Sequence, residues 1–262
     1  NLGTMLMVQG IPYDSDAGRA WCGALTAIMT GQAYATSAQI AKPKGAVPGD
    51  AKNQQSMLRV MRKHRRATDA IAKKLIPTAL GATARAAWDE AVELGEKYGY
   101  RNAQATVLAP TGTIGLLMDC DTTGIEPDFS LVKFKKLAGG GYFKIVNQSI
   151  PAALKHLGYG EYESGAIIEY AMGTMHLRGT PHINEESLRE KGFTAEDFTK
   201  IEASLPGVYT IGQAFSKHVL GRDVSLESLG FTQAQITEAN DVICGHMTVE
   251  GAPFLKPEHL AV

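Results

Sequence analysis

The sequence has few cysteines, no long apolar run and no surplus of either charge. Its three cysteines, Cys22, Cys120 and Cys244, are widely spaced in 262 residues. This spacing excludes a dense disulfide framework and a Cys-x-x-Cys zinc site, and it favours a reducing cytoplasm. No stretch approaches the roughly 18 consecutive apolar residues that a membrane helix requires, so we expect no membrane partner. The first residues, Asn1 to Met5, lack the basic start and cleavage pattern of a signal peptide.

The charge balance gives no support for a nucleic-acid partner. Lysine and arginine total 26 and aspartate and glutamate total 27, for a formal net charge of −1. One basic cluster stands out in a predicted helix over residues 54–66, and it consists of Arg59, Arg62, Lys63, His64, Arg65 and Arg66. It is either a solvated helix face or a surface for phosphates or an acidic partner. Because no aromatic residues are interleaved with it, it does not indicate nucleic acid.

The remaining composition is ordinary for a globular protein. Hydrophobic residues make up 44% of the chain and charged residues 20%. A length of 262 residues suffices for one large domain or two ordinary ones. The chain does not begin with Met and starts within an apolar segment, which we interpret as a piece of a longer protein.

Hydrophobic periodicity predicts a mostly helical chain. Helices are expected at residues 16–41, 54–66, 84–98, 151–157 and 161–172, with further helical residues at 70–75. Residues 131–137 and 142–146 predict a hairpin, joined by a glycine-rich turn at 138–141. We interpret residues 174–243 as a helical subdomain with short helices at 185–191, 194–204, 210–219, 225–230 and 232–242. Thr194 and Thr232 have the sequence context of helix N-caps.

The most informative stretch is a glycine and threonine turn that follows a short apolar run. Val107 to Ala109 has the length of a buried strand, and the turn Pro110 to Gly115 follows it directly. Such a turn can expose consecutive backbone N–H groups beside hydroxyl donors, and a helix starting there also favours an anion. The pattern therefore predicts a cradle for a phosphate or carboxylate. The alternative is a turn without a ligand, because short Gly/Thr motifs have many false positives. Helix, strand, glycine turn and helix in this order indicate an α/β fold.

One carboxylate lies close to this turn in the sequence. Glu126 stands in a second motif, Asp121 to Pro127, and either holds a substrate hydroxyl, orients its loop or caps it. Cys120 is flanked by Asp119 and Asp121, whose charges disfavour a thiolate, so we expect it to be a poor nucleophile.

The other cysteines and the loop histidines give no sign of chemistry. Cys22 has apolar neighbours and is expected in the core, and a structural role is also expected for Cys244. His176 and His182 lack the spacing of a metal site and are interpreted as ordinary loop histidines. We therefore assign no metal ligand and no catalytic residue in this chain.

Two motifs together resemble a known enzyme family. Residues Ala109 to Gly115 (APTGTIG), followed by Asp121 to Pro127 (DTTGIEP), resemble the substrate-phosphate loop of adenosylcobalamin-dependent (class II) ribonucleotide reductases. The family is also similar at three shorter runs, which are residues 1–4, 10–15 and 144–147. The resemblance extends over residues 1–160 and is weaker over residues 161–262.

The resemblance implies a fold and an activity. It implies part of a ten-stranded α/β barrel with an added helical subdomain. Residues 1–160 would form the later part of the catalytic barrel, and residues 161–262 would form the mainly helical subdomain and the barrel continuation. It implies radical-based reduction of ribonucleoside diphosphates to 2′-deoxyribonucleotides for DNA synthesis, with adenosylcobalamin as the cofactor that carries the hard chemistry. It also implies a ribonucleotide substrate and a thioredoxin-like reductant, and it is compatible with a homodimer.

The family's phosphate-binding residues carry over onto one short segment. They correspond to Ala109, Pro110, Thr111, Gly112, Thr113, Ile114 and Gly115. The family's radical cysteine lies in an Asn-x-Cys-x-Glu loop, which this sequence lacks, so the resemblance implies substrate binding and not turnover by this chain alone. Two alternatives stay open. One is a stand-alone nucleotide- or phosphate-binding module without catalysis, and the other is a metal- or glycyl-radical-dependent reductase with the same barrel.

Overall fold

The computed structural model describes residues 1–136 and 142–262. Residues of the described chain form two compact units, one of residues 1–127 with 261–262 and the other of residues 128–260. We call them unit 1 and unit 2, and each is described by itself. The sequence analysis places a different boundary, near residue 160, between the expected barrel part and the helical subdomain. That boundary stays a prediction.

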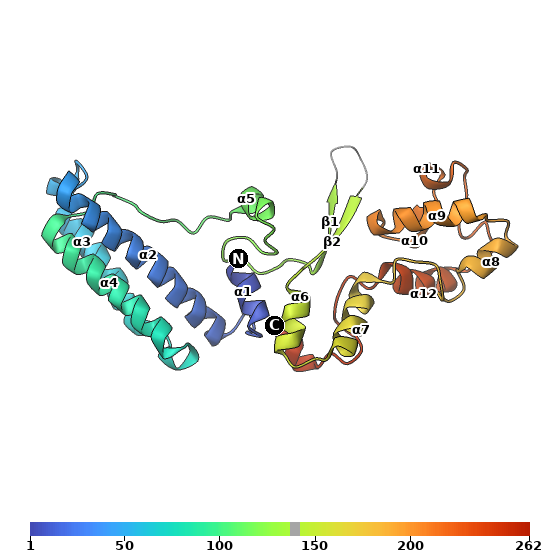
Figure 1. Cartoon of the computed structure of the whole chain (residues 1–262), viewed down its shortest axis with the longest axis horizontal. Coiled ribbons are helices and arrows are strands. Elements are labelled where there is room, and N and C mark those ends of the chain that lie inside the picture. Colours follow the sequence, from blue (N-terminus) through green and yellow to red (C-terminus); the bar gives the residue numbers. More distant parts are fainter. Residues whose placement is uncertain (137–141) are drawn as a thin grey trace. The chain divides into compact units, whose positions relative to one another are not determined.

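Unit 1 is built on three long helices. These are α2 (Asp16–Lys44), α3 (Asp50–Ala67) and α4 (Thr78–Tyr98), which lie side by side in Figure 1. Ser15 is the N-cap of α2, and its side chain accepts a hydrogen bond from the Gly18 N–H at 2.9 Å. The core between the helices contains Tyr34, Ala35, Ala38, Leu58, Met61, Trp88, Ala91 and Tyr100.

The predicted basic cluster lies on α3 and faces carboxylates of α4 and of the turn between the helices. Arg62 contacts Glu96 at 2.6 Å, and Arg65 contacts Asp89 at 2.6 Å and Asp69 at 2.5 Å. These pairs are partly exposed, so each contributes little to stability. They support the interpretation of a solvated, ion-paired helix face for this part of the cluster.

The rest of unit 1 consists of short elements, some between α3 and α4 and others near the two sequence motifs. Two 3₁₀ turns, η1 (Thr68–Ala70) and η2 (Lys73–Leu75), replace the helix expected at 70–75. The helix α1 (Leu2–Val8) precedes α2, and α5 (Gly112–Leu117) begins within the glycine and threonine turn.

Unit 2 combines one hairpin with short helices. The strands β1 (Val132–Lys136) and β2 (Tyr142–Val146) pair antiparallel, with Phe134 opposite Lys144, as the sequence predicts. The predicted turn at 138–141 lies outside the described residues. The helices are α6 (Ile150–His156), α7 (Glu161–Met172), α8 (Glu185–Glu190), α9 (Ala195–Ser204), α10 (Ile211–Ala214), α11 (Lys217–Leu220) and α12 (Gln233–Cys244), with 3₁₀ turns η3 (Leu205–Gly207) and η4 (Pro257–Ala261). The core includes Leu177, Ile183, Leu188, Ile201, Ile211, Phe215 and Ile243.

Besides the helix expected at 70–75, further predictions differ from the structure. The strand expected at Val107 to Ala109 is not paired, because a strand needs a neighbour for its backbone hydrogen bonds and the described residues provide none there. The helix expected at 210–219 is two short helices, α10 and α11, and residues 225–230 form turns. In the described part of the chain, the hairpin is the only sheet, so the expected ten-stranded barrel is not seen there.

Candidate functional site

The predicted phosphate segment, Ala109 to Gly115, includes the start of the short helix α5. Thr111 precedes α5 with a backbone φ of 53°, a conformation that is rare for a β-branched residue. The Gly115 N–H donates to the Thr111 carbonyl at 2.8 Å and closes the first turn. The N–H groups of Gly112, Thr113 and Ile114 have no partner within a helix that begins here, and none is found among the described residues. The turn therefore presents three backbone donors and the exposed Thr113 side chain to solvent.

The two glycines of this segment have different surroundings. A Cβ added at Gly112 would meet nothing within 4 Å, so the space beside its backbone is open. A Cβ added at Gly115 would lie 3.2 Å from the Thr123 Cγ2, because Gly115 packs against the second motif. Gly112 thus leaves room for a ligand to approach the backbone, whereas Gly115 allows the two motifs to approach each other.

The second motif is joined to the first at Gly124. The Gly124 N–H donates to the Thr111 Oγ1 at 2.8 Å. Gly124 has a φ of 55°, and a Cβ there would lie 2.6 Å from the Ala109 carbonyl oxygen. Only glycine satisfies both the positive φ and this close approach. The structure therefore brings together the two motifs that the sequence analysis paired.

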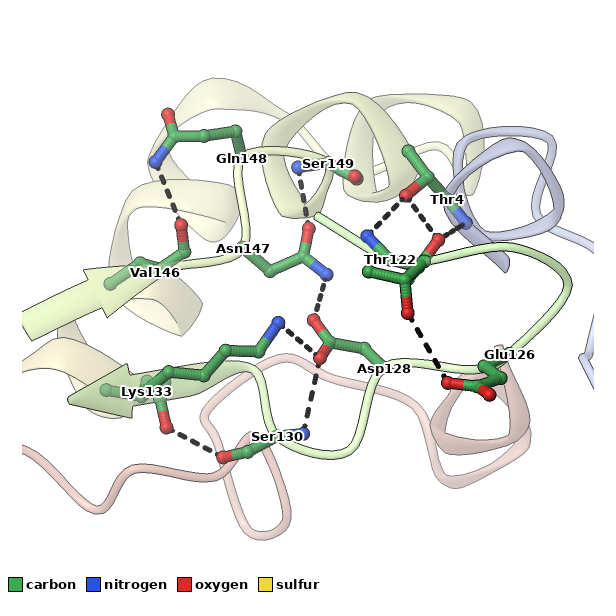
Figure 2. A network of polar contacts seen from close by, with 12 residues as sticks. Thr4, Thr122, Glu126, Asp128, Ser130, Lys133, Val146, Asn147, Gln148 and Ser149 are labelled. Carbon is green, nitrogen blue, oxygen red and sulfur yellow. Dashed lines mark hydrogen bonds and ion pairs between the residues drawn. The ribbon is translucent and has the colours of Figure 1, made fainter. Parts of the chain in front are cut away.

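The other side of the second motif is held by α1. The Thr4 N–H donates to the Thr122 Oγ1 at 2.9 Å, and the Leu2 N–H donates to the Gly124 carbonyl at 3.1 Å. Tyr13, which follows α1, donates from its hydroxyl to the Ile125 carbonyl at 2.9 Å. Figure 2 shows the side chains of Thr4 and Thr122 pointing toward one another.

An apolar hollow of about 220 Å³ borders the phosphate segment. Its lining includes Leu25 and Met29 of α2, together with Val107, Leu108 and Thr111. Val107 is 73% exposed, although its sequence context is that of a buried strand. A ligand bound at α5 would therefore have an apolar surface beside it.

Glu126 has a local partner in its loop. Its Oε2 accepts a hydrogen bond from the Thr123 hydroxyl at 3.3 Å, and its N–H donates to the Thr123 carbonyl at 3.0 Å. This arrangement supports the loop-capping interpretation of Glu126 over a substrate-holding one.

The cysteines lie in three different environments. Cys120 is half-buried beside the phosphate segment, where its N–H donates to the Gly115 carbonyl at 3.0 Å. Cys22 is half-buried on α2, and burial raises the pKa of its thiol. Burial raises the pKa of the Cys244 thiol to about 11, while the nearby Lys144 opposes this rise. Raised pKa values disfavour thiolates, so Cys22 and Cys244 are poor candidates for nucleophiles.

Unit 2 contains a separate polar network at the base of its hairpin. The Asp128 side chain is only 2% exposed and contacts the Lys133 Nζ at 2.5 Å. The Asn147 Nδ2 donates to the Asp128 Oδ2 at 2.6 Å, and the Asn147 Oδ1 accepts from the Ser149 N–H at 2.8 Å (Figure 2). These contacts fix both strands and the start of α6, which is a structural role.

Another buried cation connects two helix ends in unit 2. The Lys144 Nζ donates to the Met172 carbonyl at the end of α7 and to the Cys244 carbonyl at the end of α12, at 2.5 and 2.6 Å. Burial lowers the pKa of Lys144. A cation is favourable at helix C-termini, where carbonyl groups lack partners within the helix.

The sequence analysis missed the residues that hold the phosphate segment in place. Thr4 and Thr122 are separated by 118 residues, and threonines at such a distance carry no pairing signal. The hydrogen bond of Thr111 was also not foreseen, although the closeness of the two motifs in sequence was a partial indication. Of the predicted loop histidines, His182 contacts Glu238 at 2.8 Å.

None of the described helices is long and apolar enough to cross a membrane.

Comparisons with known proteins place these features in one family. Residues 1–194 match the family described as "Ribonucleotide reductase, barrel domain". Vitamin B12-dependent ribonucleotide reductases from Bradyrhizobium diazoefficiens and Agrobacterium fabrum are each 52% identical to this chain over its whole length. A protein of the same name from Rhodopirellula baltica is 52% identical over 72% of the chain. The chain spans 24%, 23% and 18% of the length of these three relatives. The chain therefore belongs to the ribonucleotide reductase family, and its first 194 residues match the barrel domain of that family.

Proposed function

We propose that this chain is part of a vitamin B12-dependent ribonucleotide reductase and that residues Ala109 to Gly115 bind the phosphates of its substrate. The proposed reaction converts ribonucleoside diphosphates to 2′-deoxyribonucleotides for DNA synthesis in the cytoplasm. The ribose 2′-hydroxyl leaves as water, and a dithiol, recycled by a thioredoxin-like reductant, supplies two electrons. The whole-chain identity of 52% to two proteins with this name supports the proposal.

The observation that carries the phosphate role is the hydrogen bond between the Thr111 Oγ1 and the Gly124 N–H. This bond occupies the Thr111 oxygen as an acceptor and leaves the hydroxyl proton available to donate to an anion. Together with the N–H groups of Gly112, Thr113 and Ile114, the hydroxyls of Thr111 and Thr113 form a set of donors. Donors of this kind suit a diphosphate, since each oxygen of the ligand can accept several hydrogen bonds.

The cofactor of the proposed reaction is adenosylcobalamin, which would supply the radical chemistry. The residues described here do not identify a place for it. Two histidines border hollows of this chain, and each is stacked on an aromatic ring. The ring centroids of His64 and Trp88 lie 5.2 Å apart, and those of His246 and Tyr170 lie 4.0 Å apart. We therefore assign no residue of this chain to the cofactor and derive no step through it.

The phosphate role can be tested with Gly112→Val in the full-length reductase that we propose contains this chain. The new side chain enters open space, so we expect the fold to tolerate it, but it would cover the backbone donors. A charge-assisted hydrogen bond contributes about 1.5–3 kcal/mol, so we expect substrate affinity to fall at least tenfold. Isothermal titration with a ribonucleoside diphosphate measures this directly, and Thr113→Ala should act in the same direction.

Gly212→Val is a matched control for this experiment. Gly212 also lies in the first turn of a short helix, α10, and a Cβ there would likewise meet nothing within 4 Å. We expect this variant to bind nucleotide like the wild type. Equal affinity in all three variants would contradict the phosphate role. Reductase turnover by residues 1–262 alone would contradict the proposal that this chain is only one part of the enzyme.

A further inference from the structure

Helix α1 obtains its N-terminal hydrogen-bond acceptors from a distant part of the chain. The first N–H groups of a helix have no partner within it, and side chains of the preceding residue commonly accept from them. In α1, the side chain of Asn1 accepts no such bond. The Leu2 N–H instead donates to the Gly124 carbonyl and the Thr4 N–H to the Thr122 Oγ1. The 122–124 loop therefore serves as the cap of α1.

The Thr4 and Thr122 side chains strengthen this contact. Their Oγ1 atoms lie 2.8 Å apart in a hydrogen bond, and the Thr122 N–H donates to the Thr4 Oγ1 at 3.2 Å. Thr122 is 3% exposed, so these bonds are shielded from water. The backbones also approach closely, since a Cβ added at Gly3 would lie 2.4 Å from the Glu126 carbonyl oxygen. Figure 2 shows this pair between α1 and the loop.

The peptide groups of Gly124 transmit this anchoring to the phosphate segment. The Gly124 carbonyl accepts from α1, and its N–H donates to the Thr111 Oγ1. Thr111 has a positive φ, which is unfavourable for a β-branched residue and persists only where the surroundings impose it. The bond from Gly124 is the contact that fixes the Thr111 side chain. A shift of the 122–124 loop would therefore release Thr111 and the first turn of α5.

We propose that Thr4 and Thr122 are positioning residues for substrate binding. They hold the 122–124 loop against α1, which fixes Gly124 and, through it, Thr111 and the donors of α5. This inference rests on the proposed phosphate role of residues 109–115. It predicts that loss of the threonine pair weakens phosphate binding although neither side chain touches the ligand.

The test uses Thr122→Val and Thr4→Val in the full-length reductase. Valine keeps the shape of threonine and removes the hydroxyl, and Thr4→Val is the milder change because the Thr4 N–H keeps its bond to Thr122. We expect KM for the ribonucleotide to rise roughly tenfold for Thr122→Val, with kcat at saturating substrate changed less than twofold. This split is expected because the phosphates lie away from the reacting ribose and bind alike in the ground and transition states. The inhibition constant of inorganic pyrophosphate should rise in parallel.

Two further variants separate positioning from a general structural effect. Thr122→Ser restores the hydroxyl and should return KM to within about twofold of the wild type. Thr83→Val removes an exposed threonine hydroxyl from α4, where it bonds only to the Ala79 carbonyl of its own helix, and should change neither KM nor pyrophosphate inhibition. Failure of serine to rescue, or a fall in kcat without a rise in KM, would overturn the positioning role.

Thr113→Val distinguishes the two proposals from each other. If Thr113→Val raises KM and both Thr122→Val and Thr4→Val do not, the phosphate role stands and the positioning role is wrong. If Thr113→Val and Gly112→Val also leave KM and pyrophosphate inhibition unchanged, the phosphate role itself is wrong. Should Thr122→Val fail to fold, the Thr4→Val and Thr4→Ser pair decides the question, with a rise in KM expected only for valine.

Discussion

Helix α1 of unit 1 is capped from far along the chain, whereas helices of unit 2 are capped by their neighbours in sequence. Helices α8, α9 and α12 of unit 2 begin with a capping box, and their N-cap residues are Asn184, Thr194 and Thr232. Helix α2 of unit 1 is capped locally as well, by Ser15. In unit 1, the cap of α1 comes from Thr122, which lies 118 residues beyond Thr4. Local caps specify where helices begin, whereas the distant cap fixes a loop. The distant cap therefore joins two segments of unit 1, whereas each local cap of unit 2 acts on its own helix.

The surroundings of the phosphate segment also differ from the helix crossing of unit 2, although unit 2 exposes large apolar side chains of its own, such as Phe129 at 86%. In unit 1, the region around the phosphate segment exposes large apolar residues, with Val107 at 73% and Leu117 at 85%. In unit 2, the ends of α7 and α12 cross at Gly173, which is half-buried, and at Gly245, which is buried. Residues after each helix bond to the other helix, as the Thr174 N–H does to the Val242 carbonyl at 2.9 Å and the His246 N–H to the Tyr170 carbonyl at 2.9 Å. This reciprocal crossing makes unit 2 sensitive to small changes in volume.

The largest effect that would sharpen this comparison is expected for Gly173→Ala. A Cβ there would lie 2.2 Å from the Ile243 carbonyl oxygen, and Gly173 has a φ of 79°. Backbone atoms on both sides must then separate, so we expect a loss of more than about 4 kcal/mol in the free energy of unfolding. Urea denaturation followed by circular dichroism measures the change.

Gly158→Ala is the control for Gly173→Ala. Gly158 also has a positive φ, of 91°, but a Cβ there would meet nothing within 4 Å. Its cost should be only the conformational strain of about 1 kcal/mol. Similar losses in the two variants would show that the crossing is not tightly packed and would break the contrast between the units.

A pH dependence centred on Cys244 is the next largest effect. Burial raises the pKa of this thiol to about 11, Asp241 acts in the same direction and Lys144 opposes it. Because the pKa in the folded state exceeds the ordinary value of 9.0, the neutral thiol stabilises the fold fully below that pH. This contribution is lost as the pH rises toward 11, which corresponds to about 2–3 kcal/mol.

The measurement is urea denaturation between pH 8 and 11 for the wild type and Cys244→Ala. Lys144 titrates with the opposite sign, because burial lowers its pKa and its charge is lost more readily in the folded state. It is present in both proteins, so the difference between their pH slopes reports the thiol together with its electrostatic coupling to Lys144. We expect the wild type to lose more stability with rising pH than the variant. Parallel slopes would mean that the Cys244 site is less buried than the structure indicates.

The sequence predicted the elements that local rules determine. The helix at Glu161–Met172 has the predicted bounds, the hairpin lies where alternation placed it, and Thr194 and Thr232 are the N-caps. Each of these depends on residues fewer than about fifteen positions apart. The prediction of a strand at Val107 to Ala109 was wrong for the described residues. A strand must pair with a neighbouring strand, and the hydrophobic pattern of one segment does not show whether that neighbour exists.

The candidate site was predictable in part for the same reason. The two motifs carry recognisable glycines and threonines, and their closeness in sequence made the family resemblance specific without predicting that they touch. The bond from Gly124 to Thr111 and the contacts of Thr4 with Thr122 were not predictable, because hydroxyl pairs at long separation leave no pattern in one sequence. Lys144 was likewise missed, since alternation on a strand does not show that its ammonium group reaches two helix ends.

The smallest expected effect tests whether caps in unit 2 act locally. The Thr232 Oγ1 accepts from the Gln235 N–H at 3.3 Å, while the Gln235 side chain accepts from the Thr232 N–H at 2.9 Å. Thr232→Ala should therefore cost about 1 kcal/mol in the free energy of unfolding, measured by urea denaturation. Nucleotide affinity should remain unchanged, because this cap holds only its own helix, whereas Thr122→Val should alter affinity through the loop that it anchors. An affinity loss for Thr232→Ala as large as that for Thr122→Val would remove the distinction between a local cap and a positioning one.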